Sequence, residues 1–364
     1  LAALQRSTNE EQVCEDVCSS SSVGPYGFEW PEDFDYASYD EFQENYHTVL
    51  AKRLKKWEHL LRRPRPIKRS RQLKRYVRKG IPQGHRKQVW MVLSGAAALQ
   101  AQNQSQYKSL LQSTLQQDLV ETIQIDVPRT FPDNIYFHNG TDGKQVPLFN
   151  VLVAHAHLDQ GVGYCQGLNF IAGLLLLTTE DEEATFWLLR VLVKHLLPDY
   201  YTRDMIGLLT DIEVLSELVR QRMPLVHAHL RKNDVSWAIV TTKWFICLFA
   251  EVLPIETVLR IWDCLFSEGS KVLFRVALTL VAKNQQRILD APGFAEITAV
   301  FKDMVSGSVV TDCHAFMLAM PRTVFNVQAI FREPKRLKRA HIEELRTTCR
   351  VKVEQEQKLL RASR

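Results

Sequence analysis

Apolar residues recur three or four positions apart along most of this chain, and that spacing limits its fold more than any other feature. The first such series runs from Phe42 to Leu61 and ends before Pro64 and Pro66. This period places the apolar side chains on one face of an α-helix, and proline ends such a helix. The sequence therefore predicts a long amphipathic helix near the start of the chain.

The same spacing returns after this first helix. Further helical segments are predicted at residues 72–79, 85–99, 205–219, 271–290 and 334–360. Alternation of β-branched and polar residues between tight turns, which is typical of strands, is absent from the sequence. No fixed internal period points to a solenoid of repeats. We therefore expect an all-α fold.

Length and composition exclude several other classes. The most apolar run, 171–177, is far shorter than the roughly 20 residues that a membrane-spanning helix needs. The seven cysteines are odd in number and widely spaced, which fits neither a disulfide framework nor a zinc site. We expect a soluble protein whose polar first 25 residues form a disordered leader.

Charge is distributed unevenly along the chain. Residues 52–79 hold fourteen Lys or Arg and one acid, so this segment carries +13 and the remainder about −8. With the acidic stretch 29–44, it forms an N-terminal extension over residues 26–79 that is first acidic and then basic. Such a segment suits an anionic membrane or an acidic partner. Aromatic residues do not alternate with the basic ones as in a nucleic-acid groove, so nucleic acid is not expected as a partner.

Three short motifs contain residues that could carry chemistry. In RKGIPQGHRKQVW, Arg86 stands one helical turn before Trp90, which falls on the apolar stripe as a core anchor. Arg86 is either a surface residue or a buried arginine that binds a carboxylate through two parallel hydrogen bonds.

In IQIDVPRTFP, the prolines stiffen a loop that presents Arg129. A rigid mount reduces the side-chain entropy that arginine loses when it binds a ligand. Asp126 could fix this loop or pair with Arg86. In GVGYCQG, Gln166 stands between glycines, just before an apolar helix.

A loop-mounted arginine and a loop-mounted glutamine together suggest phosphoryl chemistry. Hydrolysis of GTP needs an aligned water and neutralisation of the charge on the transferred phosphoryl group. A glutamine amide both donates and accepts hydrogen bonds, so it can hold the water, and arginine can neutralise the charge.

The three motifs R-x-x-x-W, I-x-x-D-x-x-R and Y-x-Q, in this order, resemble the TBC domain of Rab GTPase-activating proteins. The flanking sequences RTFPDNIYF and VGYCQGLNFIAG share this resemblance, which covers residues 80–270, with weaker similarity to about 320. Two earlier stretches, PYGFEWPEDFD and KRYVRKGIP, resemble one subgroup of the family. The matching residues are Arg86 and Trp90; Ile123, Asp126 and Arg129; and Tyr164 and Gln166.

The resemblance implies a V-shaped, all-helical domain that binds a GTP-loaded Rab GTPase and acts in vesicle trafficking. Arg129 would be an arginine finger, and Gln166 a glutamine finger that aligns the water. Asp126 and Arg86 would organise the Arg129 loop, and Tyr164 would support or contact the switch region of the GTPase. The protein would need no cofactor of its own, because the partner carries GTP and magnesium. We expect it in the cytoplasm or peripherally on organelle membranes, as an activator rather than an independent enzyme.

Other functions have different support in the sequence. A GTPase is excluded because the chain lacks a G-x-x-x-x-G-K-[ST] loop. A metal-dependent or nucleophilic hydrolase has no ligand spacing or G-x-S-x-G stretch in its favour. A non-catalytic adaptor that binds Rab or other partners through the same helices stays open, because a fold does not fix a function.

Overall fold

The structure is a computed structural model that describes residues 23–30, 36–62, 67–113, 117–138, 143–306 and 337–362. As expected, the fold is all-α. The described part contains no strand, only two isolated β-bridges. The predicted leader lies outside the described residues except for 23–25. No helix in the described part of the chain is long and apolar enough to cross a membrane.

The helices are α2 (Tyr36–Leu61), α3 (Arg71–Lys79), α4 (Gln83–Ser94), α5 (Ala96–Gln102), α6 (Gln106–Leu111), α7 (Gln117–Asp126), η1 (Val127–Arg129), η2 (Ile135–Phe137), α8 (Gln145–Leu158), α9 (Leu168–Thr179), α10 (Glu182–Val191), η3 (Leu192–Leu196), α11 (Ile206–Arg222), α12 (Pro224–Lys232), α13 (Trp237–Ile246), α14 (Ile255–Glu268), α15 (Lys271–Lys283), α16 (Gln285–Asp290), α17 (Phe294–Ser306) and α21 (Arg339–Ala362).

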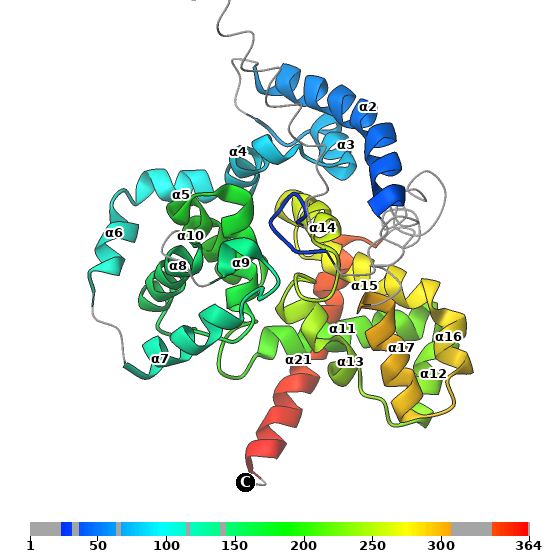
Figure 1. Ribbon diagram of the computed structural model, residues 1–364. Coiled ribbons are helices and arrows are strands. Elements are labelled where there is room, and N and C mark those ends of the chain that lie inside the picture. Colours follow the sequence, from blue (N-terminus) through cyan, green and yellow to red (C-terminus); the bar gives the residue numbers. More distant parts are fainter. Residues whose placement is uncertain are drawn as a thin grey trace, which may run out of the picture.

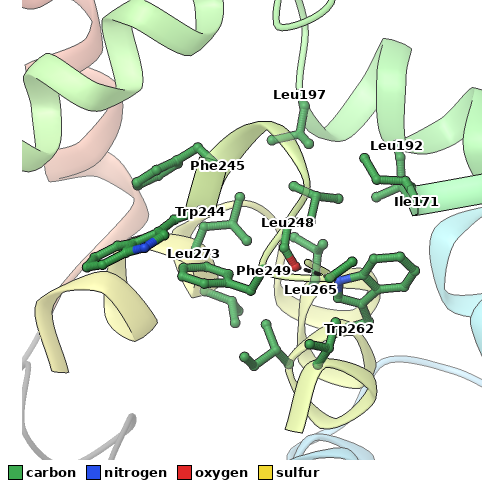
Figure 2. Packing of buried hydrophobic residues seen from close by; sticks show 14 of the residues in the cluster. Ile171, Leu192, Leu197, Trp244, Phe245, Leu248, Phe249, Trp262, Leu265 and Leu273 are labelled. Carbon is green, nitrogen blue, oxygen red and sulfur yellow. Dashed lines mark hydrogen bonds between the residues drawn. The ribbon is translucent and has the colours of Figure 1, made fainter. Parts of the chain in front are cut away.

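Two groups of helices make up the molecule (Figure 1). Helices α5–α10 form the first group, and α11–α13 with α15–α17 form the second. Helix α14 lies between them and packs against α3, α4 and α15. One hydrophobic core runs through both groups. Figure 2 shows Ile171 of the first group in the same cluster as Trp262 of α14 and Leu273 of the second group.

Among its described side chains, helix α2 packs on the body through residues near its C-terminal end. The buried indole of Trp57 donates to the carbonyl of Gly80 over 3.1 Å. The apolar stripe predicted for this helix is only partly covered, since Val49, Leu50 and Leu54 are each about 40% exposed. The side chains of 37–46 lie outside the described part.

Two of the predicted helices are each broken into a pair. The segment 85–99 is interrupted at Gly95, which adopts φ +88° between α4 and α5. The segment 271–290 is interrupted at Asn284 between α15 and α16. The apolar period continues across both breaks, so the periodicity alone did not reveal them.

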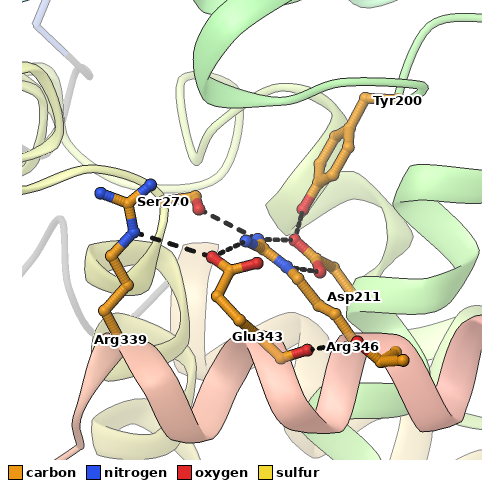
Figure 3. Close-up of polar contacts among 7 residues, drawn as sticks. Tyr200, Asp211, Ser270, Arg339, Glu343 and Arg346 are labelled. Atoms are coloured by element: carbon orange, nitrogen blue, oxygen red, sulfur yellow. Dashed lines mark hydrogen bonds and ion pairs between the residues drawn. The ribbon is translucent and has the colours of Figure 1, made fainter.

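The C-terminal helix α21 begins at Arg339 and lies against α11 (Figure 1). Figure 3 shows the polar contact between them. Arg346 donates two hydrogen bonds to the buried carboxylate of Asp211, at 2.7 and 2.6 Å, and a third to Ser270. The hydroxyl of Tyr200 donates to the same carboxylate. The predicted charged terminal helix is therefore attached to the core.

Candidate functional site

Arg129 ends a short 3-10 turn that continues α7. Pro128 fixes the first residues of this turn, and Thr130 is already extended, so the chain changes direction at Arg129. The Arg129 side chain is exposed. Its guanidinium makes no hydrogen bond or ion pair with any residue that the structure describes. It is therefore available to a ligand or a partner protein.

Gln166 lies in the turn that joins α8 to α9, and its side chain is also exposed. The turn is closed by the amide of Gly163, which donates to the carbonyl of Asp159 over 2.6 Å. Gly163 and Gly167 have φ of +60° and +105°, conformations that favour glycine. Within the described chain, no hydrogen bond engages the Gln166 amide group.

Two side-chain hydrogen bonds join these loops. The hydroxyl of Tyr164 donates to Asp126 over 2.8 Å, and the amide of Asn169 donates to the Thr130 hydroxyl over 2.8 Å. In sequence, the first pair precedes the exposed arginine and glutamine, and the second pair follows them. Each loop is thus fixed to the other on both sides of its exposed side chain.

The partners of these bonds are themselves held by the backbone. The Thr130 hydroxyl donates to the carbonyl of Asp126 over 2.9 Å, and the Asn169 side-chain oxygen accepts from the amide of Gly167 over 3.0 Å. Burial and the bond to Asp126 raise the pKa of Tyr164 far above its usual value. Its hydroxyl therefore keeps the proton that it donates.

Aromatic packing holds the residues that follow Arg129 against the body of the protein. The ring of Phe131 makes edge contacts with Phe28 and Phe170, with centroids 5.2 and 5.4 Å apart. Gly173 of α9 lies so close that an added Cβ would come within 3.1 Å of the Thr130 methyl group. The loop is therefore seated directly on α9.

Arg86 is buried but does not contact Asp126, which corrects one of the two sequence-based alternatives. Its Nε donates to Asp263 of α14 over 3.2 Å, and its Nη1 donates to the Tyr26 hydroxyl over 2.6 Å. The two parallel bonds expected for a buried arginine are replaced by one bond to each of two partners. Burial opposes the charge of Arg86, but Asp263 and Tyr26 outweigh it and raise its pKa.

Trp90 and Ile123 are both fully buried, as a core role requires. The indole of Trp90 also donates to Asp263 over 2.9 Å, and the amide of Ile81 donates to the same carboxylate over 2.9 Å. Asp263 thus joins α4 to α14 at the centre of the molecule. Ile123 instead packs in α7, in the turn before Asp126.

Sequence reasoning missed four residues of this region: Tyr26, Thr130, Asn169 and Asp263. Asn169 and Asp263 left a signal, because each is a polar residue within an apolar helical run. A buried polar residue must find a partner, so such a position predicts a specific contact. Tyr26 left no comparable signal.

A hollow of about 510 Å³ opens beside Arg129. The segment 23–30 and the start of α14 line it on other sides, and Glu251 and Glu256 are among its lining residues. In the described chain, no cluster of three or more His, Cys, Asp or Glu side chains could hold a metal ion.

Comparisons with known proteins agree with the motifs. The model of the Rab-GTPase-TBC domain family matches residues 83–289. The human growth hormone-regulated TBC protein 1 is 51% identical over 332 residues, covering 91% of this chain and 96% of that protein. The zebrafish (Danio rerio) growth hormone-regulated TBC protein 1-A is 48% identical, covering 92% and 91%. These relatives confirm the subgroup that the two N-terminal stretches indicated.

The fold is similar to that of a solved relative. The crystal structure of the Chlamydomonas flagellar RabGAP TBC domain has a TM-score of 0.69 and is 30% identical. It covers 82% of this chain, and 98% of that chain is matched. The similarity therefore extends well beyond the three motifs.

Proposed function

Since the chain belongs to the Rab-GTPase-TBC domain family, we propose that it accelerates GTP hydrolysis by a Rab-family GTPase, with Arg129 and Gln166 acting in trans. One observation carries the proposal. The two exposed side chains project from loops that are joined by the Tyr164–Asp126 and Asn169–Thr130 hydrogen bonds. Neither side chain is engaged within the part of the protein that the structure describes.

The proposed chemistry follows from what each group can do. The guanidinium of Arg129 would neutralise charge that develops on the phosphoryl oxygens, while the amide of Gln166 would accept from and donate to the attacking water. An arginine supplied in trans is worth about 10³–10⁵ in rate, or roughly 4–7 kcal/mol of barrier. The nucleotide and its magnesium ion would belong to the partner.

The remaining motif residues would act by positioning Arg129 and Gln166. Tyr164 and Asp126 would set the distance between the loops by a partly buried hydrogen bond. Arg86 and Trp90 would act at longer range, because they bind Asp263 and so hold α4 against α14. Fixed loops matter here because phosphoryl transfer depends on positioning more than on covalent chemistry.

Single-turnover GTP hydrolysis by a panel of Rab proteins tests the proposal. We expect Arg129→Ala and Gln166→Ala each to remove at least about 10² of the acceleration, and the loss for Arg129 can reach the roughly 10³–10⁵ known for an arginine supplied in trans. Both variants should unfold at the same temperature as the intact chain, because both side chains are exposed. Arg231→Ala, which removes an exposed arginine on α12, is the matched control.

The adaptor function makes the opposite forecast. A Rab that binds the chain but hydrolyses GTP no faster in its presence would favour a non-catalytic adaptor. A Rab that is accelerated equally by both alanine variants would show that other residues carry the activity.

Peripheral contact with an anionic membrane is a second proposal, supported by a basic groove between α2 and α3. Lys52, Lys56, Arg75 and Lys79 line it, and its volume is about 270 Å³. The exposed Val49 of α2 also lines it, and this mixture of basic and apolar side chains would suit lipid headgroups and the outer acyl region. This would place the protein on the cytoplasmic side of an organelle membrane.

Sedimentation with liposomes tests this contact. We expect binding to vesicles that contain phosphatidylserine, weaker binding at high salt, and loss of binding in the double variant Lys56→Glu/Lys79→Glu. Lys358→Glu, an exposed lysine of α21, is the control. The proposal would be contradicted if binding did not depend on the salt concentration, or if the double variant still bound the vesicles.

A further inference from the structure

Residues 23–30 form a short segment that lies before the family match and against the loop after Arg129 (Figure 1, dark blue loop). We propose that this segment is a positioning element for Arg129, with Phe28 and Tyr26 as its positioning residues. The inference rests on the proposed function. It goes beyond that function because it assigns the positioning of Arg129 to a part of the chain outside the matched domain.

Backbone hydrogen bonds join the segment to residues 133–135. The amide of Glu29 donates to the carbonyl of Asp133 over 2.8 Å, and the amide of Ile135 donates to the carbonyl of Gly27 over 2.9 Å. The buried side chain of Asn134 donates to the carbonyl of Tyr26 over 2.9 Å. Three consecutive residues after the Arg129 loop are therefore held by the segment.

The segment 23–30 can approach residues 133–136 this closely because residue 27 is a glycine. Its φ is +84°, and a Cβ at this position would lie 2.4 Å from the ring of Tyr136. No side chain other than hydrogen fits there without movement of that ring. The segment is therefore shaped for this contact.

Phe28 contacts the residue that turns the Arg129 loop. Phe131 has φ +51°, a left-handed conformation that is unfavourable for a bulky side chain and persists only when its surroundings hold it. Its ring meets Phe28 edge-on, with centroids 5.2 Å apart and planes at 81°. Phe28 thus stabilises a strained residue two positions after Arg129.

Tyr26 connects the segment to the buried charge at the centre of the molecule. Its side chain is buried, and its hydroxyl accepts the hydrogen bond from Arg86 over 2.6 Å. Arg86 has Asp263 as its other partner. Through Tyr26 the segment is anchored to both α4 and α14, so it can hold the loop against the rigid part of the fold.

The effect expected from such an element is on rate rather than on affinity. A displacement of about 1 Å in a catalytic group can reduce a rate by 10². Loss of the Phe28 ring should allow Phe131 to relax and Arg129 to shift. The face that meets the Rab should otherwise stay the same.

The test is single-turnover hydrolysis by a responsive Rab at rising concentrations of the full chain. We expect Phe28→Ala to lower the maximal rate roughly tenfold and Tyr26→Phe about threefold, with an unchanged half-saturating concentration. Tyr107→Phe is the matched control, because it removes a similar tyrosine hydrogen bond, 2.7 Å to Glu182. Phe28→Leu keeps an apolar side chain at this position and replaces the alanine variant if that one does not fold.

The outcomes separate this inference from the proposed function. An intact chain that accelerates no Rab sinks the proposed function itself. If the intact chain is active and the folded Phe28 and Tyr26 variants reach the same maximal rate as the intact chain, only the positioning role is overturned. A change only in the half-saturating concentration, or a fall in rate matched by Tyr107→Phe, also overturns it.

Discussion

Thr130 and Asn169 set the geometry of two loops although neither belongs to the three motifs. Their hydrogen bond is buried and spans 39 positions of sequence. Each also satisfies a backbone group of its own loop. A hydrogen bond weakens when its donor–hydrogen–acceptor angle is bent. The Asn169–Thr130 bond therefore restrains the relative orientation of the two loops as well as their separation.

Asn169→Ala should therefore disturb both stability and rate. It leaves the amide of Gly167 and the hydroxyl of Thr130 without their buried partner, which should lower the free energy of unfolding by about 1–3 kcal/mol. The acceleration of GTP hydrolysis should fall about tenfold, because the two loops lose one of their two connections. Urea unfolding and single-turnover hydrolysis measure the two effects. Asn103→Ala, which removes a remote asparagine contact at the C-terminal end of α5, should leave the rate unchanged.

Gly95 and Gly84 offer a matched pair for backbone effects. An added Cβ would meet nothing within 4 Å at either position, but Gly95 has φ +88° whereas Gly84 lies within α4. We expect Gly95→Ala to lower the free energy of unfolding by about 1 kcal/mol and Gly84→Ala to raise it by about 0.5 kcal/mol. Thermal unfolding of both variants measures this, and equal shifts would contradict the conformational explanation.

At the scale of helices, the sequence predicted type and order better than ends and contacts. The apolar period predicted a helix at 205–219, close to the observed α11. Pro224 is the first residue of α12, a position that suits proline because the first residue of a helix needs no amide hydrogen. Gly95 and Asn284 break helices while the period continues, so they could not be seen from it. The partner of Arg86 lies 177 positions away in α14, and no local pattern specifies such a contact.

At the site, too, the motifs predicted which side chains are exposed but not which other segments contact them. The residue types predicted Arg129 and Gln166 as exposed groups on loops, and both are exposed. Their roles stay predictions. The segment 23–30 could not be connected with them from sequence, because its contacts depend on the tertiary arrangement.

Helix α3 is joined to α14 and α15 by one buried carboxylate. Glu268 accepts two hydrogen bonds from Arg78, at 2.6 and 2.8 Å, and also lies near Lys74, Lys271 and Arg275. Burial opposes its charge, but Arg78 and Lys74 outweigh it and lower its pKa from about 4.5 to about 2. Glu268→Gln should lower the free energy of unfolding by about 3 kcal/mol at pH 7.

The pH dependence of that difference follows from the lowered pKa. The carboxylate stabilises the fold fully above pH 4.5, and the contribution is lost as pH falls toward 2. Denaturant unfolding at several pH values should show the intact chain and Glu268→Gln converging below pH 4.5. Glu354→Gln, which removes an exposed pair with Arg350, should differ little from the intact chain at any pH. A constant gap for Glu268→Gln would contradict this account.

For the whole molecule, the C-terminal helix completes a charge pair in the core. Asp211 is buried in α11, and only Arg346 of α21 brings it a positive charge within the described ion pairs (Figure 3). The same carboxylate accepts from Tyr200, whose pKa burial raises far above its usual value. Attachment of α21 is therefore tied to the electrostatics of the core.

Arg346→Met should lower the free energy of unfolding by about 3 kcal/mol, because it leaves a buried carboxylate without its cation. Adding Asp211→Asn should restore part of that loss, since the neutral amide needs no counter-charge. Chemical denaturation measures both. Lys352→Met, which removes an exposed pair with Glu213, should change stability by less than about 1 kcal/mol. A double variant as unstable as the single one would contradict the pairing.

The contacts of Tyr26 and Arg346 have a practical consequence for anyone who wishes to express a minimal domain. Both residues lie beyond the matched span 83–289, yet both neutralise or satisfy charged groups inside it. Cloning boundaries drawn at that span would leave Arg86 short of an acceptor and Asp211 without its cation. A shortened chain that keeps residues 23 to 362 should be soluble, whereas a chain cut to residues 83 to 289 should precipitate.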